Sequence, residues 1–146
     1  MKETDTVELL KECDSGVQIG ISSIEDSLKY VRNDDLRERL DRSKAEHERL
    51  RDEIQSHLTN QSSQDTVSGT NGMAKAMSWM KMNATLAFNG SEQKVAELIT
   101  EGCDMGINSL SRYLNEYNGS DEKARDFAKR LIRLEDKLRE DLRTYL

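Results

Sequence analysis

Residues 13–19 read CDSGVQI, and ninety positions later residues 103–109 read CDMGINS. Each phrase lies in a stretch whose core-facing positions are three and four residues apart, the spacing that places side chains on one face of an α-helix. The first stretch carries this stripe at positions 7, 10, 14, 17, 21, 24, 28 and 31, and the second at 96, 99, 103, 107, 110, 114 and 117. The same phrase in two helical stretches indicates an internal repeat.

Each of these stretches is followed by another with the same periodicity, at residues 36–58 and 122–145. A shift of 88 positions superimposes the stripes of these following stretches, whereas a shift of 90 superimposes CDSG on CDMG. Short polar turns, with acidic cap residues such as Asp35, separate the helices of each pair. We therefore expect two duplicated helical hairpins, 7–58 and 92–146, with the second turn shorter by two residues.

The composition agrees with an all-α fold. The 146 residues include no proline, although average usage of about 5% would give about seven. Proline interrupts helices, so its absence favours a chain that is almost entirely helical. Charged residues make up 34% and hydrophobic residues 35%, a balance that suits amphipathic helices with narrow apolar stripes. The length predicts one domain spanning residues 1–146.

The segment 59–90 separates the two hairpins. Its first part, 59–72, is rich in Ser, Thr, Asn and Gly and predicts a linker. Its second part, MAKAMSWMKMNATLAF at 73–88, predicts a short helix that covers the core, or else an adaptable contact surface for a partner. The segment is long enough to cross the bundle lengthwise, so the third helix would begin at the end where the second began. A long crossover between two hairpins predicts a ferritin-like four-helix bundle.

Three stretches of the chain carry a resemblance to a known family. LLKECDSGVQIG at 9–20, AMSWMKMNATLAFNGSEQKVAELI at 76–99 and ITEGCDMGINSLSRYL at 99–114 resemble an uncharacterised bacterial family of ferritin-like four-helix proteins. Its members show a cysteine followed by glycine in the first helix, a Trp-Met crossover and a second Cys-x-x-Gly phrase. The resemblance implies the fold and assigns no activity.

The repeated phrases suggest close packing. Gly16 and Gly20 lie one helical turn apart, as do Gly102 and Gly106, and glycine in a helix interior costs about 1 kcal/mol relative to alanine. We interpret these glycines as the place where the first and third helices approach each other. Cys13 and Cys103 are expected to be small, reduced core residues, with a disulfide between them as the alternative.

Four polar residues occupy or border the predicted stripes: Asp14, His47, Asp104 and Glu135. Ferritin-like proteins often bind two irons through Glu and Glu-x-x-His ligands, but this sequence contains no Glu-x-x-His. The four residues are therefore either a degenerate site for iron or another divalent metal, or structural groups that hydrogen-bond to their neighbours. We favour structural pairing, which needs no cofactor.

The net charge of −6, with acidic and basic residues interspersed, argues against binding to nucleic-acid phosphates. No apolar run is long enough to cross a membrane, and the N-terminus lacks the apolar core of a signal peptide, so we expect a cytoplasmic protein. The mixed charge runs at 34–53 and 130–143 are typical of solvated helix faces.

No nucleophile elbow or phosphate-binding loop is recognisable. The sequence therefore favours a non-enzymatic bundle that acts by association, either as a homodimer or with another protein. The alternative is a ferritin-like metal-binding or redox protein built around the four polar residues.

Overall fold

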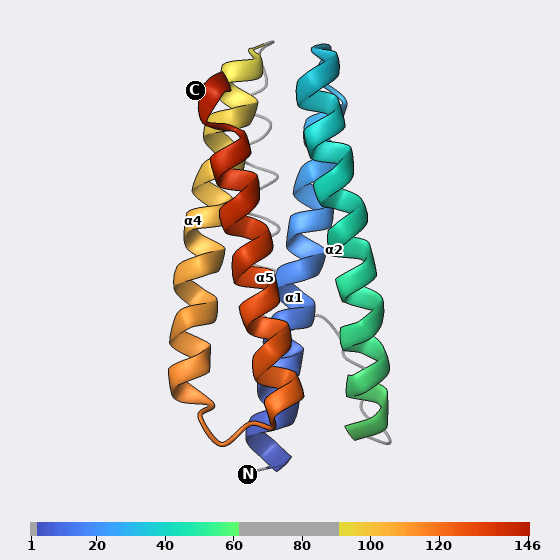
Figure 1. Ribbon diagram of the computed structural model, residues 1–146, viewed down its shortest axis with the longest axis vertical. Helices are drawn as coiled ribbons and strands as arrows, with labels where there is room; N and C mark the ends of the chain where they lie inside the picture. Colours follow the sequence, from blue (N-terminus) through green and yellow to red (C-terminus); the bar gives the residue numbers. More distant parts are fainter. Residues whose placement is uncertain (1–2, 62–90) are drawn as a thin grey trace.

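The computed structural model describes residues 3–61 and 91–146 (Figure 1). Within these ranges the chain forms four long helices, a terminal 3-10 turn and no strand. The elements are α1 (Glu3–Leu28), α2 (Asp34–Gln61), α4 (Glu92–Glu116), α5 (Glu122–Asp141) and η1 (Arg143–Tyr145). The all-α prediction is confirmed for these residues. Of the predicted linker at 59–72, residues 59–61 belong instead to the last turn of α2. The rest of the linker and the predicted short helix at 73–88 lie outside the described residues.

Polar side chains at the helix starts explain where three of the helices begin. Ser91 and Asp121 cap α4 and α5 by accepting hydrogen bonds from the backbone N–H groups of Lys94 and Ala124. The cap of α2 is Asn33, whose Oδ1 accepts from the N–H of Leu36 at 2.9 Å. Such caps satisfy N–H groups that have no partner within the helix.

Acidic residues in the first turns of α1 and α4 tie the two hairpins together. Glu92 of α4 accepts hydrogen bonds from the N–H groups of Arg32 and Asn33, in the turn between α1 and α2. Asp5 of α1 accepts from the N–H of Gly119, in the turn between α4 and α5. Each hairpin therefore supplies a carboxylate to the turn of the other, at opposite ends of the bundle.

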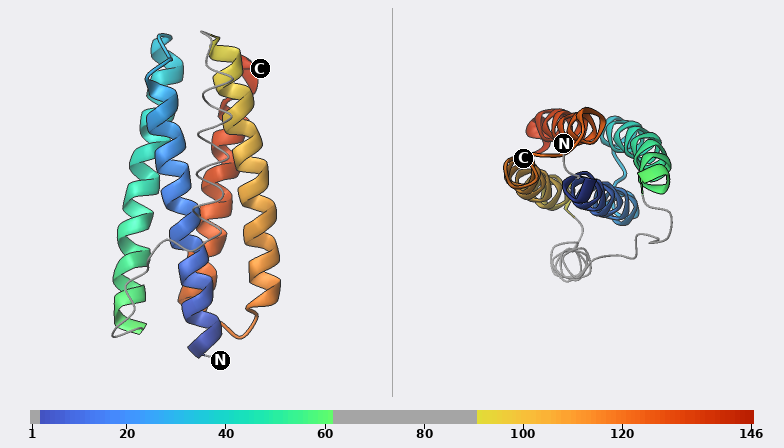
Figure 2. Two further views of the ribbon diagram at one scale, coloured as in Figure 1. Left: turned by 180° about the vertical axis from the view of Figure 1, so that it is seen from behind. Right: turned by 90° about the horizontal axis from the view of Figure 1, so that it is seen from below.

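The helices are arranged around the bundle in the order α1, α2, α5, α4 (Figure 2, right). Among the described residues, the backbone of α1 also approaches that of α5 across the bundle, whereas no Cα atoms of α2 and α4 come within 8 Å of each other. Helices α2 and α4 both begin at the upper end in Figure 1 and run in the same direction. The expectation that the third helix begins where the second begins is therefore met.

The core consists of two apolar clusters, one towards each end of the bundle. Leu9, Ile54 and Leu131 belong to the lower cluster, and Ile24, Leu40 and Leu142 belong to the upper one. Each of the four helices contributes to both. The stretch between the clusters contains several polar residues and glycines rather than large apolar side chains. Among the described residues, the two buried ionisable side chains of α2 and α5, His47 and Glu135, lie in this middle layer.

Two structural expectations need correction. The turns comprise residues 29–33 and 117–121, so they are equal in length and the second is not shorter. The glycines do not mainly bring α1 and α4 together. A Cβ atom at Gly20 would lie 2.7 Å from His47 of α2, and one at Gly106 would lie 2.2 Å from Glu135 of α5. The missing side chains make room for polar groups of the other two helices.

Candidate functional site

The structure separates the four predicted polar residues into a pair that shares one cavity and two residues that lie elsewhere. Asp14 is 1% exposed and accepts hydrogen bonds from Nε2 of Gln18 at 2.8 Å and Nε2 of Gln55 at 3.1 Å. Asp104 lies nearer the surface, where it accepts a hydrogen bond from Arg139, which also bonds to Asp136. Both aspartates thus have side-chain partners.

His47 lies in the middle layer and is 1% exposed. Its Nδ1 is 2.8 Å from the backbone oxygen of Ser43. Because a carbonyl oxygen can only accept, Nδ1 carries the proton and Nε2 carries the lone pair. Burial lowers the pKa of His47, so the ring is neutral at pH 7. The Nε2 lone pair lies over Gly20, where a Cβ atom would be 2.8 Å away.

Glu135 lies in the same layer on α5 and is 7% exposed. Burial raises the pKa of Glu135 to about 8, so the carboxyl group is mostly protonated at pH 7. Its Oε2 atom has no hydrogen-bond partner among the described residues. A buried carboxyl with no cationic neighbour avoids the cost of burying a charge by keeping its proton.

His47 and Glu135 line a common cavity of about 30 Å³, to which all four helices contribute. The volume is sufficient for one or two water molecules. The thiol of Cys103 also lines this cavity. Burial raises the pKa of Cys103, and the carboxyl group of Glu135 raises it further; burial likewise raises the pKa of Cys13. Both thiols are free and remain protonated at neutral pH, so neither is a reactive thiolate.

Metal binding by this cavity would require more ligands than the structure brings together. Within residues 3–61 and 91–146, no group of three or more His, Cys, Asp or Glu side chains is placed to hold a metal ion. His47, Cys103 and Glu135 line the cavity without forming such a group, and Asp14 and Asp104 have other partners. The cavity is best described as a polar layer of neutral groups within an apolar core.

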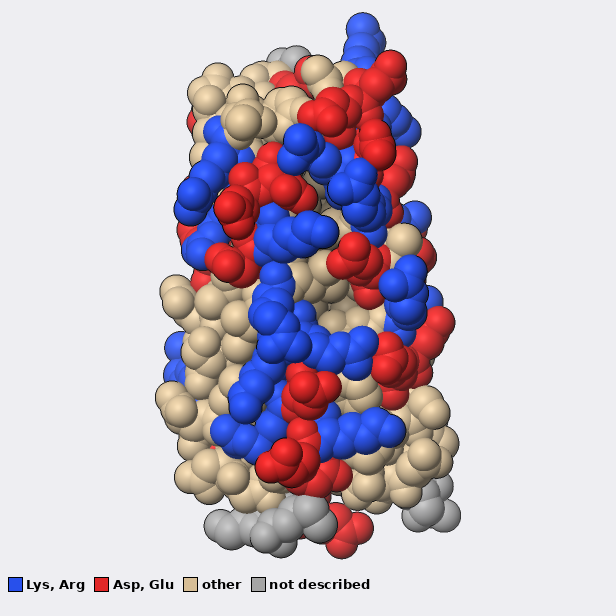
Figure 3. Space-filling model, in the orientation of Figure 1, with Lys and Arg blue, Asp and Glu red and all other residues tan. Residues whose placement is uncertain are grey.

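A second feature lies on the outer surface, along the line where α2 and α5 run side by side. Figure 3 shows Lys and Arg side chains gathered over this face, around a hollow with an uncharged floor. We call this feature the basic groove. Its wider part has a volume of about 350 Å³ and is lined by Glu46, Arg49, Leu50, Arg130, Arg133, Leu134 and Lys137.

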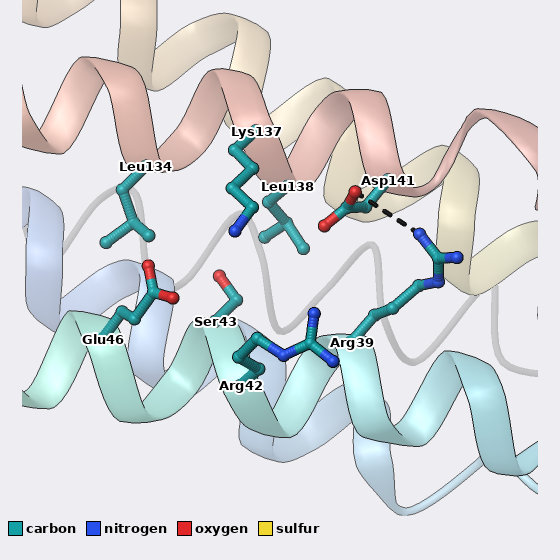
Figure 4. A pocket seen from close by; sticks show the side chains of 8 residues that line it. All are labelled: Arg39, Arg42, Ser43, Glu46, Leu134, Lys137, Leu138 and Asp141. Atoms are coloured by element: carbon teal, nitrogen blue, oxygen red, sulfur yellow. Dashed lines mark ion pairs between the residues drawn. The ribbon is translucent and has the colours of Figure 1, made fainter.

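The narrow part of the basic groove continues towards the C-terminal end of α5 (Figure 4). In the space between the helices, Lys137 of α5 points towards Ser43 of α2, and Glu46 of α2 points towards Leu134 of α5. An ion pair between Arg39 and Asp141, at 3.3 Å, bridges α2 and α5 at this end. The groove is therefore one continuous feature that shares Glu46, Leu134 and Lys137 between its two parts.

The other end of the basic groove is bridged by Arg130, which donates two hydrogen bonds to Glu53 at 2.8 and 3.1 Å. These bonds lower the pKa of Glu53. Between the two bridges, Arg42 pairs with Glu38 at 2.8 Å, whereas three other cations lack such a partner. Arg49, Arg133 and Lys137 have no ion pair within the part of the chain that the structure describes. The groove thus concentrates positive charge on a chain whose net charge is −6.

The sequence signal for the groove is visible in retrospect. Helix α5 contains seven Lys and Arg residues against six Asp and Glu residues, and Glu135 is mostly uncharged. Arg130, Arg133 and Lys137 follow one another at steps of three and four, which places them along one stripe of the helix. This stripe was interpreted as a solvated face because the sequence does not reveal which helix lies beside it.

Comparisons of the chain with known protein families, curated proteins and solved structures found no match. No helix among the described residues is long and apolar enough to cross a membrane.

Proposed function

We propose that this chain is a non-enzymatic binding protein whose basic groove contacts a negatively charged partner. One observation carries the proposal: the groove holds three cations, Arg49, Arg133 and Lys137, that have no ion pair among the described residues. Such a concentration of like charge is unfavourable in the isolated chain and favourable when an anionic surface covers it. The buried thiols are protonated and the polar layer is neutral, so neither presents a charged group to a partner.

We further propose that the fold is ferritin-like and arose from two duplicated hairpins. The common direction of α2 and α4 supports a lengthwise crossover between them. The reciprocal contacts of Glu92 and Asp5 with the turn of the other hairpin support a twofold relationship.

The binding proposal can be tested with polyanions of defined length. Backbone amide chemical shifts are recorded while poly-L-glutamate, and in a second titration poly-L-lysine, is added to the full chain. We expect poly-L-glutamate to shift amides of α2 and α5 around Arg49 and Arg133, with an affinity that falls as salt is added. Poly-L-lysine should leave these amides unchanged.

A charge-reversal pair provides the matched control. Arg133→Glu with Lys137→Glu changes two exposed cations of the groove, whereas Lys123→Glu with Lys129→Glu makes the same change in charge elsewhere on α5. We expect the groove variant to bind poly-L-glutamate at least tenfold more weakly than the control variant. Equal affinities in the two variants, or no response to poly-L-glutamate, would contradict the proposal.

A further inference from the structure

We infer that the occupant of the basic groove is an acidic amphipathic α-helix of a partner protein. This inference rests on the proposed function and adds the form and chemistry of the partner. The relevant observations are the length of the groove, the spacing of its cations and the nature of its floor.

The length of the surface suits a helix lying across the outer edges of α2 and α5, since the narrow part of the groove has a volume of only about 10 Å³ and the wide part about 350 Å³. The groove runs from the Arg39–Asp141 bridge to the Arg130–Glu53 bridge, and these bridges are fourteen residues apart on α2. At a rise of 1.5 Å per residue this distance is about 21 Å, or about four helical turns. A helix placed over two neighbouring helices adds a third member to the packing, as in recognition of an amphipathic helix by a hydrophobic groove.

The cations line the groove rather than converge on one point. Arg130, Arg133 and Lys137 follow one stripe of α5, and Arg42 and Arg49 border the groove from α2. A single phosphate would need several of these groups directed at one centre. Carboxylates one turn apart on a docked helix match cations one turn apart along a groove. The arrangement therefore favours an extended ligand with several carboxylates.

The floor adds an apolar contact to this electrostatic pattern. Leu50 and Leu134 lie at the bottom of the wide part, between the charged side chains of the two helices. Leu50 is only 3% exposed, so a leucine of the partner helix, one turn from its carboxylates, would contact mainly Leu134. Such a pattern of apolar and acidic residues distinguishes an amphipathic helix from an unstructured acidic segment.

Glu46 is an acidic residue in the middle of the basic groove. It lines both parts and has no ion pair among the described residues. A carboxylate at this position repels an entirely acidic ligand and attracts a partner that carries one cation at the matching place. Glu46 would therefore fix the position of the helix along the groove.

The test uses two synthetic peptides of equal length, about eighteen residues, and equal net charge. One places leucine and glutamate, with alanine between them, at the spacing of an amphipathic helix. The other has the same sequence except that two central alanines are replaced by proline, so that it cannot form a continuous helix. Binding to the full chain is measured by fluorescence anisotropy at low and physiological salt, with circular dichroism to follow peptide helicity.

We expect the helical peptide to bind at least tenfold more tightly than the proline peptide and to gain helicity on binding. Arg133→Glu with Lys137→Glu should weaken its binding at least tenfold, while the Lys123→Glu, Lys129→Glu control should stay within about twofold. Glu46→Gln should strengthen binding of this acidic peptide about two- to threefold. Circular dichroism of each variant shows that the fold is kept.

The outcomes separate the two proposals. If poly-L-glutamate binds at the groove but the helical and proline peptides bind equally, the helical partner is refuted and the proposed function stands. If none of these anions binds, both are refuted. Sedimentation velocity of the wild type and the variant without peptide tests whether a second copy of this chain occupies the groove. A wild-type dimer that becomes a monomer in the Arg133→Glu, Lys137→Glu variant would identify the second copy as the occupant and overturn the inference.

Discussion

The middle layer of the core and the basic groove both place charged residue types beside leucines, but they treat the charge in opposite ways. In the core, Glu135 keeps its proton and His47 is neutral, because burial disfavours their charged forms. In the groove, Arg133 and Lys137 are solvated and stay charged without partners. A residue type therefore predicts a possible charge, whereas its surroundings decide whether the charge exists. For this chain, we expect the core layer to affect stability, and we propose that the groove affects association.

The largest expected effect concerns Glu135 and pH. Its folded pKa of about 8 lies above its unfolded value of 4.5, so the stabilisation is complete below pH 4.5 and is lost as the pH rises through 8. Between pH 6.5 and 9 the loss amounts to about 2 kcal/mol of unfolding free energy. Urea denaturation across this range should show the decline in the wild type. Glu135→Gln should remove most of it below pH 8 and leave the smaller decline near pH 9 that comes from the buried thiols Cys13 and Cys103, whose unfolded pKa is 9.0.

His47 adds little to the pH dependence of the unfolding free energy between pH 6.5 and 9. Its folded pKa lies below the unfolded value of 6.5, so its contribution is present above pH 6.5 and is lost on acidification. Glu140→Gln, an exposed change on the same helix, is the matched control and should retain the wild-type decline. An unchanged pH dependence in Glu135→Gln would show that Glu135 is ionised in the folded protein, and the contrast between core and groove would fail.

The next effect compares two glycines of α1. A Cβ atom at Gly20 would lie 2.7 Å from the His47 ring, whereas one at Gly16 would make ordinary contact with Leu131 at 3.4 Å. We expect Gly20→Ala to lower the unfolding free energy by about 1–2 kcal/mol, because overpacking outweighs the better helix propensity of alanine. Gly16→Ala should instead raise it by up to about 1 kcal/mol. Thermal and urea unfolding of both variants would reveal a difference in sign; the same sign for both would refute the packing of His47 on Gly20.

These glycines also show how far the sequence could predict the structure. The stripes correctly identified core positions such as Val17, Ile54 and Leu138, because helical periodicity alone assigns the buried face. Periodicity does not determine how a helix is rotated against each neighbour, so Gly20 was assigned to a contact between α1 and α4 rather than to His47. The sequence also does not show which of several neighbouring polar residues caps a helix. Asp35 was predicted as a cap, but Asn33 caps α2, and Asp35 accepts hydrogen bonds from Arg39 and Tyr145.

The candidate sites depend even more on long-range contacts. His47 and Glu135 could be selected from the sequence as polar residues within apolar stripes, and the structure places them in one cavity. Asp14 and Asp104 were selected for the same reason, yet Gln55 and Arg139 bind them away from that cavity. The basic groove escaped prediction because its two walls are 77 residues apart at the Glu53–Arg130 contact. Only the pairing of α2 with α5 turns two mixed-charge runs into a cationic surface.

The smallest expected effect is on stability in the groove itself. Arg133→Gln and Lys137→Gln remove exposed charges that have no ion pair among the described residues, so each should change the unfolding free energy by less than about 0.5 kcal/mol. Both changes should be neutral or slightly stabilising, because they reduce repulsion between neighbouring cations. Urea unfolding at low and at physiological salt measures this directly, and salt should reduce any gain. A loss above 1 kcal/mol in either variant would mean that these side chains hold the bundle together, and the cations would then have a structural role in place of the one proposed for binding.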